Sequence, residues 1–271
     1  MPNQPKISPE QLAANRKALL EKLEKRLPDA SEQAPDLSNT SLSQATLRLK
    51  SILGNNYFGA EDYQAIFRRD VDKVPRVPAS VTPELLNSKC PMAGDGRLIK
   101  DTHRLVLVPR LLGTDEFTIM WLEEHADKYS AENSMPQAFK SNVTWFHEKK
   151  ENFAHMPTGK THWALLPMLP VPDTFEKDDK QQLKIMKAFP DYETPHAIEM
   201  LAGIVLPYLR DARGIENYDY PFRDKHGRCE DRTSDGSCVD VGGFDPSGIG
   251  VSSRWHKKQY IFLGRCSARK L

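Results

Sequence analysis

An apolar run near residue 200 constrains the fold more than any other feature of this 271-residue sequence. Thr194-Pro195 favours a helix start, Gly214 favours a stop, and apolar residues recur between them on the helical period. These residues are Ala197, Ile198, Leu201, Ala202, Val205, Leu206 and Leu209. The run predicts the strongest helix of the chain. Pro207 lies within it, so we expect either a kink or a proline on the outer face.

Two other apolar runs predict buried strands. Residues 104–109 are rich in β-branched side chains, end at a proline and are apolar on both faces, which predicts a central strand. Residues 162–168 predict a second buried strand, and shorter strands are expected at 239–244 and 259–263. Helices are expected at 42–53, 60–67, 114–128, 142–152 and 174–189. Without a regular βαβ rhythm, this pattern predicts an α+β fold with a small mixed or antiparallel sheet and several helices.

The first forty residues differ from the rest. Ser8-Pro9 favours a helix start, and five leucines from Leu12 to Leu27 form one apolar stripe. Residues 28–40 are rich in Pro, Ser, Asp, Gln and Asn, as in a flexible linker. We therefore predict an amphipathic helix plus flexible linker over residues 1–41 and one globular domain over 42–271. The helix either docks a partner protein or packs on its own domain.

Composition places few limits on the partners. The formal net charge is +1 at pH 7, so no global field attracts a polyanion, and we do not expect nucleic acid as a partner. The N-terminus lacks the apolar segment of a cleaved secretory signal, and no run reaches the roughly 18–20 apolar residues of a membrane span. We expect a cytoplasmic protein with reduced thiols, or one exported by a route without a cleaved signal peptide.

An Asp/Cys-rich segment at residues 224–240 holds the candidate metal ligands. They are His226, Cys229 and Cys238, and the acidic residues around them are Asp224, Asp231, Asp235 and Asp240. The cysteines lack the Cys-x-x-Cys spacing of a zinc site, and the acidic residues lack the alternation of a calcium loop. A polar turn between strands is the simpler interpretation. In an oxidising compartment the two cysteines would be able to pair.

Other chemical signals also have simpler explanations. Residues 154–161, which end in Gly159-Lys160-Thr161, fit a loose phosphate-loop pattern, but an apolar strand is expected where that motif needs a helix. We therefore reject nucleotide binding there. The basic C-terminal residues, among them Arg254 and Arg265, are interleaved with aromatic ones and fit a strand with a solvated face better than a nucleic-acid site. The remaining candidates for a hydrolase, without a family signature, are Cys90, His103, His147, His155, His162 and His196.

Several segments together resemble a known family. They are Asn56-Tyr-Phe-Gly-Ala-Glu-Asp62, Cys90-Pro91 through Asp95-Gly96 to Thr102-His103 with Val108-Pro109, His162-Trp-Ala-Leu165, Val241-Gly-Gly-Phe244 and Ser247-Gly248. In this order they are similar to a family of uncharacterised proteins from intracellular, amoeba-associated bacteria, over about residues 50–271. That family commonly ends in arginine-lysine-phenylalanine, and Leu271 departs from this ending. Some members follow protein-interaction segments, so the resemblance implies a host-directed role, but it transfers no activity and no catalytic residue.

Two classes of function follow from the sequence. We expect a non-enzymatic protein-binding or host-directed effector-type module, in which the helix from Leu12 to Leu27 contacts the partner. The alternative is a hydrolase-like or metal-dependent enzyme that uses the histidines and the Asp/Cys-rich loop. A histidine, a cysteine and a carboxylate that converge in one cleft would favour the enzyme.

Overall fold

The computed structural model describes residues 37–141, 145–148, 151–215 and 218–271. The chain divides into two compact units, Met1–Ser43 and Gln44–Leu271. The helix expected from residue 42 is α2 (Leu37–Leu53), which begins earlier, so residues 37–40 are helical rather than linker. The segment from Leu12 to Leu27 lies outside the described residues, and its helix and its docking role stay predictions.

The second unit has an α+β fold, as the sequence predicts. Its helices are α3 (Ala60–Phe67), α4 (Pro83–Leu86), α5 (Ile99–Thr102), α6 (Ile119–Glu132), α7 (Trp145–Glu148), α8 (Asn152–His155), α9 (Asp179–Met186) and α10 (Ala197–Asp211), with 3-10 turns at Gly54–Asn56 and Pro172–Thr174. The helix expected at 60–67 is confirmed as α3. The helix expected at 174–189 is shorter, because the Asp178 side chain caps it by accepting a hydrogen bond from the Gln181 amide at 2.8 Å.

A five-stranded sheet contains both predicted buried strands. Its order is β1 (Tyr57–Phe58), β2 (His103–Val108), β5 (His162–Pro167), β11 (Ala268–Arg269) and β6 (Tyr192–Glu193). The β1–β2 pair is parallel and the other pairs are antiparallel. The central position expected for residues 104–109 is confirmed, since β2 has a neighbour on each side. The loop at 156–161 leads directly into β5, as its interpretation as a turn before a strand requires.

A four-stranded sheet follows α10 in the chain. Its order is β10 (Leu263–Arg265), β7 (His226–Arg232), β8 (Cys238–Asp245) and β9 (Gly248–Arg254), and a separate hairpin joins β3 (Leu111–Leu112) to β4 (Asp115–Glu116). The strand expected at 239–244 is confirmed as β8. The strand expected at 259–263 is wrong: those residues lie mostly in the connection from β9 to β10. There Tyr260 and Phe262 stack near the Arg254 guanidinium instead of extending a ladder.

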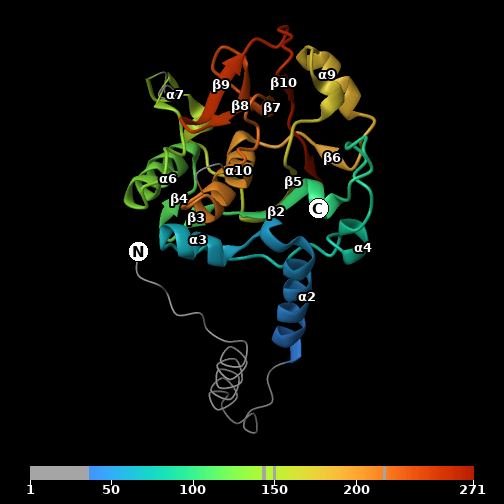
Figure 1. The fold of residues 1–271 in the computed structure, drawn as a ribbon, viewed down its shortest axis with the longest axis vertical. Coiled ribbons are helices and arrows are strands. Elements are labelled where there is room, and N and C mark those ends of the chain that lie inside the picture. The colour runs from blue at the N-terminus through green and yellow to red at the C-terminus, as the bar shows by residue number, and fades with distance from the viewer. Residues whose placement is uncertain (1–36, 142–144, 149–150, 216–217) are drawn as a thin grey trace, which may run out of the picture. The chain divides into compact units, whose positions relative to one another are not determined.

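Helix α10 lies between the two larger sheets (Figure 1) and contacts β2 and β5 on one side and β7 and β8 on the other. Twelve of its residues are buried, among them Pro207, so the expectation of a proline on the outer face is wrong. The helix ends at Asp211 rather than near Gly214. Within the described part of the chain, no helix combines the length and the apolar character needed to cross a bilayer.

The interior proline of α10 has a specific structural partner. Proline lacks an amide hydrogen, so Pro207 leaves the carbonyl of Gly203, four residues earlier, without its helical donor. The Arg104 guanidinium of β2 donates to that carbonyl from Nη1 at 2.8 Å. Gly203 also lets the sheet approach, because a Cβ there would lie 2.8 Å from a methyl group of Leu166. The proline, the glycine and the arginine thus form one local arrangement.

Candidate functional site

The four-stranded sheet has one apolar face and one polar face. Side chains alternate along a strand, and the buried residues Val239, Val241 and Cys229 point toward the core, where α10 contacts β7 and β8. The opposite face places charged residues directly across from one another. Arg265 pairs with Arg228, and Arg228 with Asp240, on three adjacent strands. This polar row crosses the middle of the sheet.

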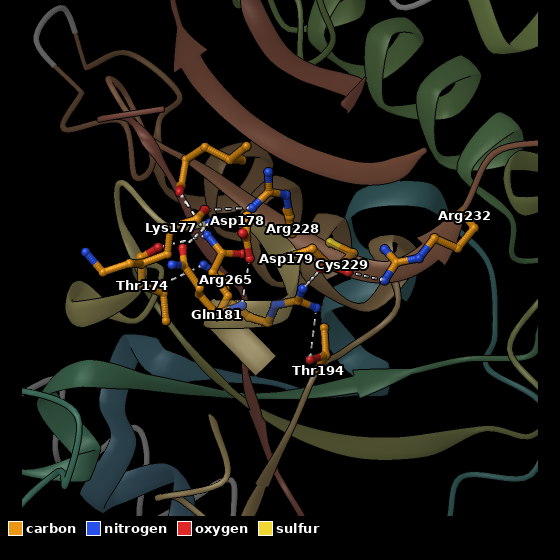
Figure 2. A network of polar contacts seen from close by, with 12 residues as sticks. Thr174, Lys177, Asp178, Asp179, Gln181, Thr194, Arg228, Cys229, Arg232 and Arg265 are labelled. Carbon is orange, nitrogen blue, oxygen red and sulfur yellow. Dashed lines mark hydrogen bonds and ion pairs between the residues drawn. The ribbon is translucent and has the colours of Figure 1, made fainter. Parts of the chain in front are cut away.

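Buried arginines dominate one end of the polar face. Figure 2 shows Asp179, at the start of α9, between Arg265 of β10 and Arg232 of β7. Arg265 is fully buried and forms an ion pair with Asp179 through Nη2, and Arg232 reaches the other carboxylate oxygen at 3.1 Å. Burial lowers the pKa of Arg265 to about 10. Because one carboxylate contacts two guanidinium groups, Asp179 attaches α9 to the sheet.

Arg228 is the second fully buried arginine of this face. Its guanidinium donates to the backbone carbonyls of Lys177, at 3.2 Å, and Lys258. Among the described residues it contacts no carboxylate, and burial lowers its pKa. The arginine network therefore carries a surplus of positive charge beside Asp240, the next residue in the row.

Asp240 holds a histidine at the other end of the face. Its side chain is fully buried, and its Oδ1 accepts from His226 Nδ1 at 2.8 Å and from Arg254 Nη1. Arginine and histidine both donate to this oxygen, so Asp240 is the anion of the cluster and His226 carries a hydrogen on Nδ1. In a ring with that single hydrogen, Nε2 is the nitrogen with a lone pair. About 16% of the His226 side chain remains exposed, so solvent reaches this residue.

A glycine leaves room for the histidine ring and a lysine. Gly243 has a φ of +61°, and a Cβ at this position would lie 2.8 Å from His226 Nε2 and 3.6 Å from Lys140 Nζ. The two nitrogens therefore converge on one point above the glycine. Lys140 is brought there because residues 138–140 pair with β9, and its ammonium group lies 2.9 Å from Asp245 Oδ2. Any side chain at 243 would displace either nitrogen.

This arrangement has the components of acid–base chemistry. A neutral imidazole whose Nδ1–H is fixed by a carboxylate is oriented to accept a proton at Nε2. A nearby ammonium group stabilises negative charge that develops on a substrate oxygen. Among the described residues, the His226 ring hydrogen-bonds to Asp240 alone.

The other two candidate metal ligands do not join His226. Cys229 faces the core beside Cys266, and burial raises its pKa well above the usual value, which keeps the thiol protonated. Cys238 lies on the same face of the sheet as His226. The residue opposite His226 is Gly242, however, and Gly242 lies four residues further along β8 than Cys238. That separation is roughly 13 Å along a strand. Both cysteines are free thiols, and no group of three or more His, Cys, Asp and Glu residues suited to a metal occurs among the described residues.

Two other histidines from the sequence lie near the start of α10. His162 Nε2 contacts Glu199 at 2.6 Å and its Nδ1 contacts the Lys160 carbonyl at 2.9 Å, so both ring nitrogens have acceptors. His196 Nδ1 contacts Asp231 at 3.0 Å, and this bond raises the pKa of His196 to about 9. Histidines that donate from the ring in this way hold a proton rather than accept one. The side chain of His147 lies outside the described residues.

Sequence reasoning placed His226 and Asp240 in one segment but did not pair them. The pair depends on the β7–β8 register, which places the two strands antiparallel across the 233–237 turn. Lys140 and Gly243 were missed as site residues. Lys140 lies about a hundred positions before Gly243 in the sequence, and no sequence motif connects it to β8, the strand that contains Gly243.

Comparisons with protein-family models, with curated proteins and with solved structures gave no match to this chain. The resemblance noted in the sequence therefore stays a prediction.

Proposed function

We propose that the C-terminal sheet carries a hydrolase-type active site in which His226 is the general base. The observation that supports it is the 2.8 Å contact between His226 Nδ1 and the buried carboxylate of Asp240, with His226 Nε2 and Lys140 Nζ both within 3.6 Å of one point beside Gly243. In the proposed reaction, Nε2 takes a proton from water while the water oxygen attacks an ester carbon. Lys140 stabilises the resulting oxyanion, and the imidazolium returns the proton to the leaving alkoxide.

The test compares ester hydrolysis by matched variants. The full chain and its variants would be assayed with p-nitrophenyl acetate and p-nitrophenyl butyrate, with buffer hydrolysis subtracted. We expect His226→Asn to lose roughly 100-fold or more of the enzyme-dependent rate, in the range typical of a general base. Asp240→Asn should also lower the enzyme-dependent rate, because an asparagine there no longer fixes the hydrogen on His226 Nδ1.

Two control variants separate this site from general surface reactivity. His256→Asn changes an exposed histidine in the connection after β9, and Lys184→Met changes an exposed lysine on α9. Lys184→Met is matched to Lys140→Met, which should lower the rate because it removes the ammonium group that stabilises the oxyanion. Both controls should keep the rate of the unchanged protein. Equal hydrolysis by the unchanged protein and His226→Asn, with both folded by circular dichroism, would reject the proposed function.

A further inference from the structure

The connection from β9 to β10, residues 255–262, joins the two edge strands of the four-stranded sheet and passes over its polar face. Its inner side contacts the sheet. The Lys258 carbonyl accepts a hydrogen bond from the buried Arg228 guanidinium, and the rings of Tyr260 and Phe262 stack with centroids 5.1 Å apart near the Arg254 guanidinium. These contacts hold the segment against the row of arginines and leave its other side facing outward.

This segment exposes large apolar side chains. Ile261, which lies between the two stacked rings in the sequence, is 76% exposed and is the most exposed large apolar residue that the structure describes. Trp255 is 55% exposed, whereas the other three tryptophans of the chain are buried or half-buried. Leu183, on the neighbouring helix α9, is also exposed. Large apolar side chains exposed at one place on a surface indicate an interaction site.

Lysines accompany these apolar side chains. No aspartate or glutamate occurs in residues 254–265, where Lys257 and Lys258 are exposed. Helix α9 lies beside the segment (Figure 1), and the Asp179 amide donates to the His256 carbonyl at 2.9 Å. The exposed lysines of α9 and its C-terminal cap are Lys180, Lys184 and Lys187. Five exposed lysines thus outnumber the exposed acids of residues 173–190, which are Asp173 and Glu176.

We propose that this surface docks on an anionic lipid bilayer, with Trp255 and Ile261 in the interfacial region and the lysines at the lipid phosphates. Segments that bind membrane surfaces place indole rings and flanking lysines at this level, and an anionic leaflet attracts each lysine. A protein partner would favour a patch whose centre lacks lysine. Single-stranded nucleic acid would stack on Trp255 but would offer no contact for the aliphatic Ile261. A bilayer accommodates both the apolar and the basic side chains.

The test measures, by co-sedimentation, how the full chain distributes between water and lipid vesicles. Vesicles of phosphatidylcholine and phosphatidylserine in equal parts should bind the protein. Vesicles of phosphatidylcholine alone should bind it roughly 20-fold or more weakly, because the lysines then meet no negative surface potential. Added salt should weaken binding to the anionic vesicles, since it screens the exposed charges.

Two variants each remove one component of the docking surface. Ile261→Ser should weaken binding to the anionic vesicles about tenfold, since it removes a large apolar side chain from the interface. Lys257→Gln combined with Lys258→Gln should weaken it roughly 20-fold, because each lysine near an anionic surface contributes about fivefold. The apolar and the electrostatic contributions are thereby measured separately.

Control variants change the same residue types elsewhere on the surface. Ile215→Ser, at a position that is 52% exposed, is matched to Ile261→Ser, and Lys73→Gln combined with Lys89→Gln is matched to the lysine pair. Both should bind like the unchanged protein. His226→Asn should also bind unchanged, because binding needs no turnover. Failure of the ester assay therefore leaves this proposal intact, and failure of vesicle binding leaves the proposed active site intact.

Trp255 provides a second readout that depends on depth in the bilayer. Its emission is the difference between the fluorescence of the unchanged protein and that of Trp255→Phe. This emission should shift to the blue with anionic vesicles. It should also be quenched when the phosphatidylcholine carries brominated acyl chains, because the indole ring then lies near those chains.

The outcomes decide between a bilayer and other partners. Binding that requires phosphatidylserine, Ile261 and the lysine pair, together with quenching by brominated lipid, supports the proposal. No binding to anionic vesicles, or binding that both variants leave unchanged, would overturn it. A single-stranded oligonucleotide is the remaining arm. If it binds as tightly as the anionic vesicles and Ile261→Ser keeps that binding, the surface is a nucleic-acid site and the bilayer assignment fails.

Discussion

The two large sheets of the C-terminal unit bury polar groups in different ways. In the five-stranded sheet the interior of β2 and β5 is apolar, and the guanidinium of Arg104 bonds to a backbone carbonyl of α10. The four-stranded sheet buries Arg228 and Arg265 completely and places Arg232, Arg254 and His226 on the same face. Two carboxylates, Asp179 and Asp240, contact four of these five side chains, all except Arg228.

This difference determines how sensitive each sheet is to a single substitution. Burial of apolar side chains is non-directional, and its loss is graded with the area removed. A buried charge without its partner is far more costly, because the remaining ion keeps its desolvation penalty. The stability of the four-stranded sheet, which also carries the proposed active site, should therefore depend on a few carboxylates. The stability of the five-stranded sheet should depend on apolar packing and on the hydrogen bond from Arg104 to the backbone of α10.

The largest effect is expected at Asp179. Asp179→Asn keeps the shape of the side chain but removes the charge that compensates fully buried Arg265 and also Arg232. We expect the free energy of unfolding to fall by about 3–5 kcal/mol, as for other broken buried ion pairs. Equilibrium unfolding in urea, followed by circular dichroism, measures the change.

The neighbouring residue Asp178 is the control for that substitution. Its carboxylate caps α9 but contacts no arginine among the described residues. Asp178→Asn leaves a residue that still caps well, so its effect should stay below about 1 kcal/mol. If both variants lose stability equally, the four-stranded sheet does not depend on the ion pair, and the contrast between the sheets fails.

A smaller effect is expected at Arg104 in the five-stranded sheet. Arg104→Met removes the donor to the Gly203 carbonyl, which Pro207 has already deprived of its helical partner. An unsatisfied buried carbonyl costs about 1–3 kcal/mol. In the Pro207→Ala background the new amide of residue 207 bonds to the same carbonyl, so Arg104→Met should cost less. The double-mutant cycle from urea unfolding measures this coupling, and a coupling near zero would refute the role assigned to Arg104.

Apolar periodicity predicted the parts of this contrast that depend on local sequence. The buried α10, the central position of β2 and the strands β5 and β8 all follow from short apolar runs. The same reasoning failed where partners come from distant segments. It treated Arg254 and Arg265 as residues of a solvated face, because nothing local indicates that Asp240 and Asp179 lie against them. Sequence reasoning also could not identify Arg104 as the donor to the Gly203 carbonyl, which Pro207 leaves without its helical partner.

The smallest effect is a dependence of the unfolding free energy on pH. It tests the charged pairs at the N-terminal end of α10, which are His196 with Asp231 and His162 with Glu199. The contact with Asp231 raises the pKa of His196 to about 9, from roughly 6.5 in an unfolded chain. The folded state therefore binds the proton more tightly, so the stabilisation is complete below about pH 6.5 and is lost as the pH rises through 9. The hydrogen bond to Glu199 likewise raises the pKa of His162, against the opposing effect of burial.

The size of this pH effect should be modest, because 59% of the His196 side chain is exposed and solvent screens the pair. We expect a decrease in unfolding free energy of under about 1 kcal/mol for His196 between pH 6.5 and 9. Asp231→Asn should flatten the decrease, whereas Asp224→Asn, at an exposed position, should leave it intact. A profile in which Asp231→Asn keeps the full slope would place the titrating group elsewhere. The unfolding free energy could instead fall between pH 6.5 and 9 by as much as it falls in Asp179→Asn. That result would mean that surface pairs stabilise this protein as strongly as the buried network.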